Sequence, residues 1–234
     1  MTENACLVWG LSLPANAVDQ VKKVLSGEEL ADAARFKSDA RREQALAGRL
    51  LMRLAASCGT ETSPRAWRIA RGSLDRPLLT GENAPADINI SHTEGYVTVA
   101  RCSTGRVGVD VEPLARAERM WAIRSKFLTD EESESWRSKP DSEQRRDLVA
   151  RWVLKEACVK AHGGGIGLDL RGITISGAGA NLRATGSAGD YALALLCAGE
   201  DHLIGVAVSR DMAPAELRDG RELLGQMNDA AANG

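Results

Sequence analysis

Long uncharged apolar runs are missing from this chain of 234 residues. The most apolar stretch, Tyr191 to Gly199, is far shorter than the about 20 residues that a membrane-spanning helix requires. The N-terminus carries Glu3 and no basic residue before its first apolar stretch, so a secretory signal is not expected. We therefore expect a cytoplasmic protein that has no membrane partner.

Cysteine and histidine are sparse, and their spacing suits neither a metal site nor a disulfide framework. The 5 cysteines never form a C-x-x-C pair, and the 3 histidines share no metal-ligand spacing with each other or with a cysteine. A zinc site is therefore not expected. The cysteines are interpreted as buried thiols in a reducing compartment.

Several signatures of known chemistry are absent as well. The chain has no G-x-S-x-G nucleophile elbow, no Walker A loop and no G-x-G-x-x-G after a strand. The run from His162 to Gly165 is similar to an esterase oxyanion loop, but it follows a predicted helix and is more simply a helix cap. The net charge of -2, from 30 basic and 32 acidic residues, argues against a nucleic-acid partner.

What the chain does contain is an order of elements that repeats. Helical patterns give way to short strands once in each half of the sequence. This order favours two α+β lobes over one doubly wound sheet. We expect an N-terminal lobe at residues 1–112, a C-terminal lobe at 113–212, and a C-terminal helix with a frayed tail at 213–234.

Two carboxylates come together in the segment Gly108–Glu112. On a strand, Asp110 and Glu112 leave on the same face, where they repel each other unless a cation lies between them. Oxygen ligands without a thiol or an imidazole select a hard cation, Mg²⁺ or Mn²⁺. A solvated strand end is the plainer interpretation, and the pair alone does not decide between the two.

A stripe on a predicted helix is the second candidate. Trp152, Glu156 and Lys160 recur every four residues and therefore share one helix face. A Glu–Lys pair at this spacing is most often a surface salt bridge, whereas a half-buried pair beside a tryptophan is a functional candidate. Both interpretations stay open at this point.

A polar turn at the end of a predicted strand is the third candidate. It runs from Asn89 to Thr93 and includes Ser91 and His92. A serine–histidine pair in a turn can bind phosphate or can simply cap the turn.

Taken in order, these segments resemble the motifs of the Sfp-type 4′-phosphopantetheinyl transferases. The segments Ile88–His92, Val107–Glu112 and Trp152–Lys160 match the family patterns N-x-S-H, G-V-D-x-E and W-x-x-K-E-A-x-x-K. The resemblance extends from about Leu7 to Val208. It implies an α+β fold with a pseudo-twofold arrangement of two similar lobes, each a small, mainly antiparallel sheet packed on a long helix, with the site between them.

The resemblance also implies a reaction. A monomer would transfer the phosphopantetheine arm from coenzyme A to a serine of an apo acyl or peptidyl carrier protein, with Mg²⁺, and release adenosine 3′,5′-bisphosphate. One alternative is a non-catalytic coenzyme A or carrier-protein binding module of the same fold. Another is a Mg²⁺-dependent phosphodiesterase that acts on a different nucleotide. The complete acidic set favours the transferase, because a module without chemistry does not need three carboxylates that repel each other.

By motif position, the resemblance implies roles for individual residues. Asp110, Glu112 and Glu156 would be the Mg²⁺ ligands. Glu156 would also take the proton of the carrier serine, and Lys160 and His92 would hold phosphate oxygens. The expected coenzyme A contacts are basic or hydroxyl side chains: Arg42, Arg49, Arg53, Arg76, Ser91, His92, Lys155 and Lys160.

Two positions are open. Asp75 stands where the family has a glycine, before Arg76 and Pro77, which leaves the shape of this loop and the affinity for coenzyme A in question. Glu132 either completes a capping box that begins at Thr129 or contacts the site.

Overall fold

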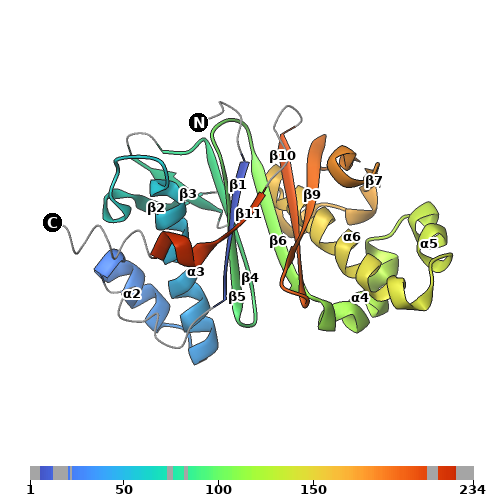
Figure 1. The fold of residues 1–234 in the computed structure, drawn as a ribbon, viewed down its shortest axis with the longest axis horizontal. Coiled ribbons are helices and arrows are strands. Elements are labelled where there is room, and N and C mark those ends of the chain that lie inside the picture. Colours follow the sequence, from blue (N-terminus) through green and yellow to red (C-terminus); the bar gives the residue numbers. More distant parts are fainter. Residues whose placement is uncertain are drawn as a thin grey trace.

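The computed structural model describes residues 6–12, 21, 23–72, 76–81, 84–209 and 216–224. Figure 1 shows the order of the elements along the chain. The first half holds β1 (Cys6–Ser12), α2 (Gly27–Ala34), α3 (Asp39–Ser57), β2 (Arg68–Arg71), β3 (Pro77–Thr80), β4 (Asp87–Thr93) and β5 (Tyr96–Cys102). The second half holds β6 (Val107–Pro113), α4 (Ala117–Ile123), α5 (Asp130–Arg137), α6 (Asp141–His162), β7 (Ile173–Ser176), β8 (Arg183–Gly186), β9 (Tyr191–Ala198), β10 (His202–Ser209) and β11 (Glu216–Asp219).

The strands form two main sheets and a ribbon. The first sheet has the order β11-β1-β5-β4, in which β1 runs parallel to β11 and antiparallel to β5. The second has the order β6-β10-β9-β8-β7 with antiparallel pairs, and β2 pairs with β3 in the ribbon. Both sheets are therefore mainly antiparallel.

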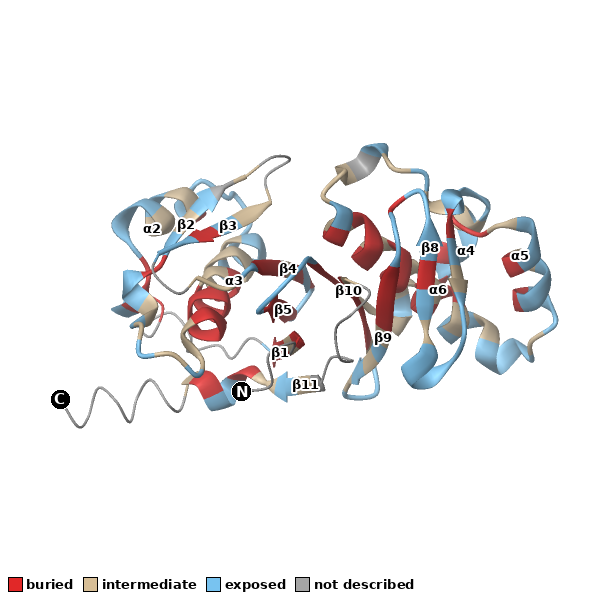
Figure 2. Ribbon diagram, turned by 90° about the horizontal axis from the view of Figure 1, so that it is seen from above, coloured by how far each residue is buried: buried red, intermediate tan, exposed pale blue. Residues whose placement is uncertain are grey.

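The two sheets pack back to back, and a long helix covers the outer face of each (Figure 1). Val8, Ala100, Val109 and Val206 belong to the apolar core between the sheets. Separate cores lie under the helices, one with α3 and one with α6, and in Figure 2 buried residues line α3, α6 and the strands between them. The predicted α+β fold of two similar lobes, each a sheet packed on a long helix, is confirmed.

Two glycines let α6 lie directly on its sheet. A Cβ atom at Gly108 in β6 would lie 2.0 Å from the Ala157 carbonyl oxygen, and one at Gly205 in β10 would lie 2.3 Å from that of Val153. Any side chain at these positions would push the helix backbone away. This close approach brings the C-terminal half of α6 within side-chain reach of β6.

Two predicted caps are present. Gly163 ends α6 in a left-handed conformation with φ 82°, so the His162 to Gly165 run is a helix cap. At the start of α5, the Glu132 amide donates to the Thr129 hydroxyl and the Thr129 amide donates to Glu132, which is a complete capping box.

The ends of the lobes differ from the expected order of elements. The segment Val107–Glu112 belongs to β6 and lies in the second sheet, so the chain passes from the first sheet to the second between β5 and β6. The expected lobe boundary at residue 112 lies later in the chain than this passage and stays a prediction. A helix was expected from Ala213, but Glu216–Asp219 forms β11 beside β1, and residues 220–224 then turn helically. Pairing with an open edge of the first sheet outweighs the local helical pattern there. The rest of the expected tail, 225–234, lies outside the described residues, as does Asp75.

None of the helices in the described ranges combines the length and the apolar character needed to span a bilayer.

Candidate functional site

The side chains of β6 alternate between two environments. Val107, Val109 and Val111 point into the core between the sheets. The intervening residues face the other way, towards α6, as the contact of Gly108 with the helix backbone shows. Asp110 and Glu112 therefore share the face that the strand spacing predicts.

Asp110 is the point at which the three motifs meet. Its Oδ1 accepts hydrogen bonds from the Lys160 ammonium at 2.7 Å and from the Ser91 hydroxyl at 2.9 Å. Lys160 Nζ also donates to Ser91 Oγ at 2.9 Å and to the Val109 carbonyl at 3.0 Å. Segments far apart in the sequence thus converge on one buried carboxylate.

Glu112 and Glu156 complete an acidic group around this point. Burial, followed by the charge of Asp110 and to a smaller extent that of Glu112, raises the pKa of Glu156 to about 7, while Lys160 opposes the shift. The pKa of Glu112 is raised by burial and by Asp110. Glu112 Oε2 is buried without a hydrogen-bond partner, and Arg116 Nε lies 3.7 Å from it.

The three carboxylates have the type of ligand atom that a hard cation such as Mg²⁺ prefers. The donors are all oxygens, they repel each other, and one buried oxygen has no hydrogen-bond partner. In the described part of the chain, however, no three histidine, cysteine or acidic side chains are already gathered as a metal site. For these carboxylates to hold a metal, their side chains would therefore have to move.

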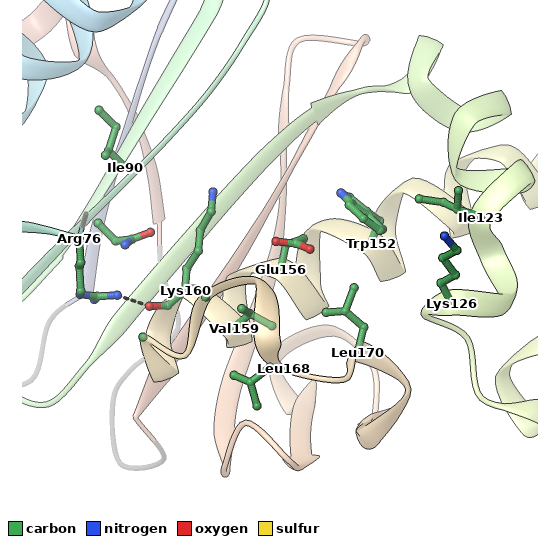
Figure 3. A pocket seen from close by; sticks show the side chains of 13 residues that line it. Arg76, Ile90, Ile123, Lys126, Trp152, Glu156, Val159, Lys160, Leu168 and Leu170 are labelled. Carbon is green, nitrogen blue, oxygen red and sulfur yellow. Dashed lines mark hydrogen bonds between the residues drawn. The ribbon is translucent and has the colours of Figure 1, made fainter. Parts of the chain in front are cut away.

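A cavity of about 440 Å³ lies beside this group. Figure 3 shows Trp152, Glu156 and Lys160 along the α6 wall, with Arg76 at one end and Lys126 at the other. Its remaining lining is largely apolar or glycine: Asn89, Ile90, Ile123, Val159, Gly163, Gly165, Leu168 and Leu170. The cavity therefore has cations at both ends and an acid in its wall.

Arg76 ties the lobes together where it lines the cavity. Its guanidinium donates to the Asp87 carboxylate of β4, to the Val107 carbonyl of β6 at 2.7 Å and to the Lys160 carbonyl of α6. His92 follows Ser91 on β4. Desolvation and the nearby cations Lys160 and Arg41 lower the pKa of His92.

Lys155 does not reach the cavity. It is 0% exposed, and Nζ donates to the Phe127 carbonyl at 2.6 Å, to Glu132 at 2.6 Å and to the Leu170 carbonyl at 3.2 Å. The expected coenzyme A contact at Lys155 is therefore wrong, because all three ammonium protons are used inside the protein. Glu132 is the helix cap and the partner of this buried lysine.

The three arginines of α3 that were expected to contact coenzyme A also lie away from the lining of the cavity. Arg53 is buried, pairs with Glu29 at 2.7 Å and donates to the Trp67 carbonyl, so its expected role as a coenzyme A contact is wrong. Arg49 donates to the Glu29 carbonyl, and Arg42 donates to Asp39 and to the Phe36 carbonyl. Arg42 and Arg49 stay predictions.

Asp87 and Lys126 were not among the expected site residues, and Asn89 was expected only as the first residue of the polar turn, without a role of its own. Asp87, Asn89 and Ser91 alternate with isoleucines along β4, and this period of two in polar residues is a signal that the sequence does contain. Lys126 follows α4 and carries no comparable pattern.

Two family models match the chain. Residues 106–207 match the model described as 4'-phosphopantetheinyl transferase superfamily, and residues 14–104 match the model described as 4'-phosphopantetheinyl transferase, N-terminal.

Curated relatives carry the same description. The 4'-phosphopantetheinyl transferase HetI of Nostoc sp. is 28% identical over 163 residues, which cover 68% of this chain and 69% of that protein. The L-aminoadipate-semialdehyde dehydrogenase-phosphopantetheinyl transferase of Xenopus laevis is 30% identical, over 59% of this chain and 48% of the relative. The chain thus spans about half the length of this vertebrate relative.

The solved holo-[acyl-carrier-protein] synthase of Thermotoga maritima superposes only loosely, with a TM-score of 0.36 and 19% identity over 45% of this chain and 64% of that chain. The family matches and the curated relatives together show that this chain belongs to the 4'-phosphopantetheinyl transferase superfamily, a family of enzymes.

Proposed function

We propose that this chain transfers the 4′-phosphopantetheine arm of coenzyme A to a serine hydroxyl of an apo carrier protein. Family membership supplies the class of reaction. The observation that carries the proposal is the convergence of Ser91, Lys160 and Asp110 beside a cavity that Glu156 lines. Because β4, β6 and α6 of one chain supply these groups, a monomer is sufficient.

Asp110, Glu112 and Glu156 would hold the metal ion, Mg²⁺ or Mn²⁺. The buried oxygen of Glu112 that has no hydrogen-bond partner and the mutual repulsion of the carboxylates support this assignment. When bound, such an ion neutralises negative charge that develops on a pyrophosphate as the anhydride bond breaks.

The protein's own groups would orient the phosphates and move the proton. The serine oxygen forms a bond to the phosphorus that carries the pantetheine, and the anhydride P–O bond to adenosine 3′,5′-bisphosphate breaks. Glu156, which lines the cavity beside Asp110 and Lys160, takes the serine proton directly or through a water. Lys160 and Arg76 stand where cations would hold the phosphate oxygens.

The nucleotide end of coenzyme A would extend towards the first lobe. His92, on β4, and Arg42 and Arg49, on α3, are the proposed contacts there, with an arginine fork on the 3′-phosphate. Ser91 would add a hydroxyl contact between this end and the acidic group. The pantetheine arm would lie against the apolar lining near Trp152.

Mass spectrometry of a panel of apo carrier proteins tests the proposal. With coenzyme A and Mg²⁺, the chain should add the mass of the phosphopantetheine arm to at least one carrier. Glu156→Gln should abolish the gain, whereas Glu143→Gln, an exposed carboxylate in the first turn of the same helix, should not. Saturable coenzyme A binding without any mass gain across the panel would overturn the proposal in favour of a non-catalytic binding module.

A further inference from the structure

The strand β6 has an open edge that no other strand pairs with in the described residues. It hydrogen-bonds to β10 on one side, and β4, in the other sheet, lies along its free side. Side chains of β4 reach across instead. The amides of Val107, Val109 and Val111 donate to Asp87 at 2.9 Å, to Asn89 at 3.1 Å and to Ser91 at 3.3 Å.

These three contacts form a ladder with regular spacing. We call Asp87, Asn89 and Ser91 the β4 ladder; each of its members bonds the β6 residue 20 positions later. The side chains are 8%, 5% and 5% exposed, so water does not replace these contacts readily. A buried amide that loses its acceptor costs about 1–3 kcal/mol, so the ladder strongly favours one register of β6 against β4.

The carbonyls on the same edge have side-chain partners too. Arg76 donates to the Val107 carbonyl at 2.7 Å, and Lys160 donates to the Val109 carbonyl at 3.0 Å. Val109 is therefore held by Asn89 at its amide and by Lys160 at its carbonyl. The next residue along the strand is Asp110, the carboxylate at which the site converges.

We infer that Asp87 and Asn89 are positioning residues of the transfer site. A slip of one residue along β6 would turn Asp110 away from α6 and into the core between the sheets. The ladder opposes that slip and keeps Asp110 facing Ser91 and Lys160. Asp87 also anchors Arg76, which lines the cavity. The inference rests on the proposed transferase function, since it assigns these residues a part in that reaction.

Asn89 also lines the cavity, so its side chain could instead contact coenzyme A directly. The two roles predict different kinetics. Loss of a substrate contact raises KM for coenzyme A, whereas loss of positioning lowers kcat with a smaller effect on KM.

Hydrogen exchange at Val109 and steady-state kinetics test the ladder together. Asn89→Ala should speed exchange of the Val109 amide about tenfold or more. It should also lower kcat about ten- to a hundredfold with KM for coenzyme A changed less than about threefold. Thr98→Val is the matched control, because this buried hydroxyl donates to the Trp9 carbonyl within the first sheet. It should leave both measurements within about twofold of the wild type.

A second pair of variants keeps the test decisive if Asn89→Ala does not fold. Asp87 does not line the cavity, and Asp87→Asn retains an acceptor for the Val107 amide whereas Asp87→Ala does not. The asparagine variant should keep more of kcat and of the exchange protection at Val107 than the alanine variant does.

Unchanged exchange at Val109 in Asn89→Ala, or a defect confined to KM, would overturn the positioning role. Equal losses in Asp87→Asn and Asp87→Ala would overturn it for Asp87. A wild-type chain without transfer activity would overturn the proposed function instead, and the exchange measurements would still decide whether the ladder holds β6.

Discussion

Lys155 and Lys160 lie on the same helix with opposite surroundings. Lys160 borders the cavity and bonds Asp110, Ser91 and the Val109 carbonyl. Lys155 is sealed in the core, where burial lowers its pKa while its pair with Glu132 opposes that shift. One supplies charge to the site, and the other holds α6 against the turn before α5.

The difference predicts separate outcomes for the two lysines. Lys155→Met leaves Glu132 buried without its cation and should lower the free energy of unfolding by about 3 kcal/mol. The protein that remains folded should bind coenzyme A as the wild type does, whereas Lys160→Met should weaken that binding. Urea unfolding and calorimetric titration measure the two effects. Lys139→Met, in a more exposed pair, is the control, and a loss of coenzyme A affinity in folded Lys155→Met would restore the lysine to the binding site.

Glu156 should make the metal-free protein less stable as the pH rises. Its pKa is about 7 in the folded chain against an ordinary value of 4.5, so folding favours the protonated form. The free energy of unfolding of the metal-free protein is therefore not reduced by Glu156 below pH about 4.5. It falls as the pH rises towards 7 and then levels off. Glu156→Gln should therefore unfold with about 2–3 kcal/mol more free energy than the wild type at pH 8, and with no difference at pH 4.5.

Urea unfolding in a chelating buffer at the two pH values measures this difference. Glu143→Gln should match the wild type at both. A Glu156→Gln variant that gains no stability at pH 8 would show that burial and the neighbouring carboxylates do not raise the pKa of Glu156.

Sequence spacing identifies residues that share a face, but it does not say how deeply they are buried. Strand alternation placed Asp110 and Glu112 together, and helix spacing placed Glu156 beside Lys160. Lys155 is adjacent to Glu156 in the same motif, but successive residues point about 100° apart around a helix. Glu156 therefore faces the cavity, whereas Lys155 faces the core. The partners of Asn89 lie in the other sheet, so no local pattern could give its contact with Val109.

The position of α6 depends on glycine at two points of its sheet. Gly108→Ala would place a Cβ atom 2.0 Å from the Ala157 carbonyl oxygen, where the obstacle is backbone and cannot rotate away. The helix must shift, so we expect a loss of about 2–3 kcal/mol in unfolding free energy. Since Lys160 is carried on that helix, transfer activity in the folded fraction should fall too.

Gly27→Ala is the control for this effect, because a Cβ atom there meets nothing within 4 Å. Urea unfolding and the mass-spectrometric transfer assay measure both variants. Equal stability of Gly108→Ala and the wild type would mean that α6 has room to move on β6.

Among the helices and strands, the features that the sequence predicted best were the two helix caps. The capping box at Thr129 and the glycine that ends α6 at Gly163 are both local, so a sequence contains them in full. The strand β11 was missed because Glu216–Asp219 has no strand pattern of its own. It exists through its pairing with β1, a contact about 200 residues away in sequence.

The back-to-back sheets should make the two lobes unfold as one unit. Each sheet buries one face against its own helix and the other against the neighbouring sheet, so neither lobe keeps a closed core alone. Val206→Ala, between the sheets, should lower the stability of α3 and α6 equally, by about 1–3 kcal/mol.

Hydrogen exchange read by mass spectrometry can follow α3 and α6 separately. Leu195→Ala, at a partly exposed side chain of β9, is the control and should change exchange in neither helix. Faster exchange in α6 alone would show that the lobes open independently. The order of helices and strands in the sequence was enough to predict two lobes. It was not enough to predict that the two sheets pack against each other, because alternating valines are typical of strands in many kinds of sheet packing.

The parallel pairing of β1 with β11 has a consequence for biosynthesis. The strand β1 lacks one of its two neighbours until residue 219 has been translated. Until then, the first sheet presents an unpaired edge while the whole second lobe is still being made. The first sheet, most of whose strands are made early, is therefore completed only after the second lobe has been made.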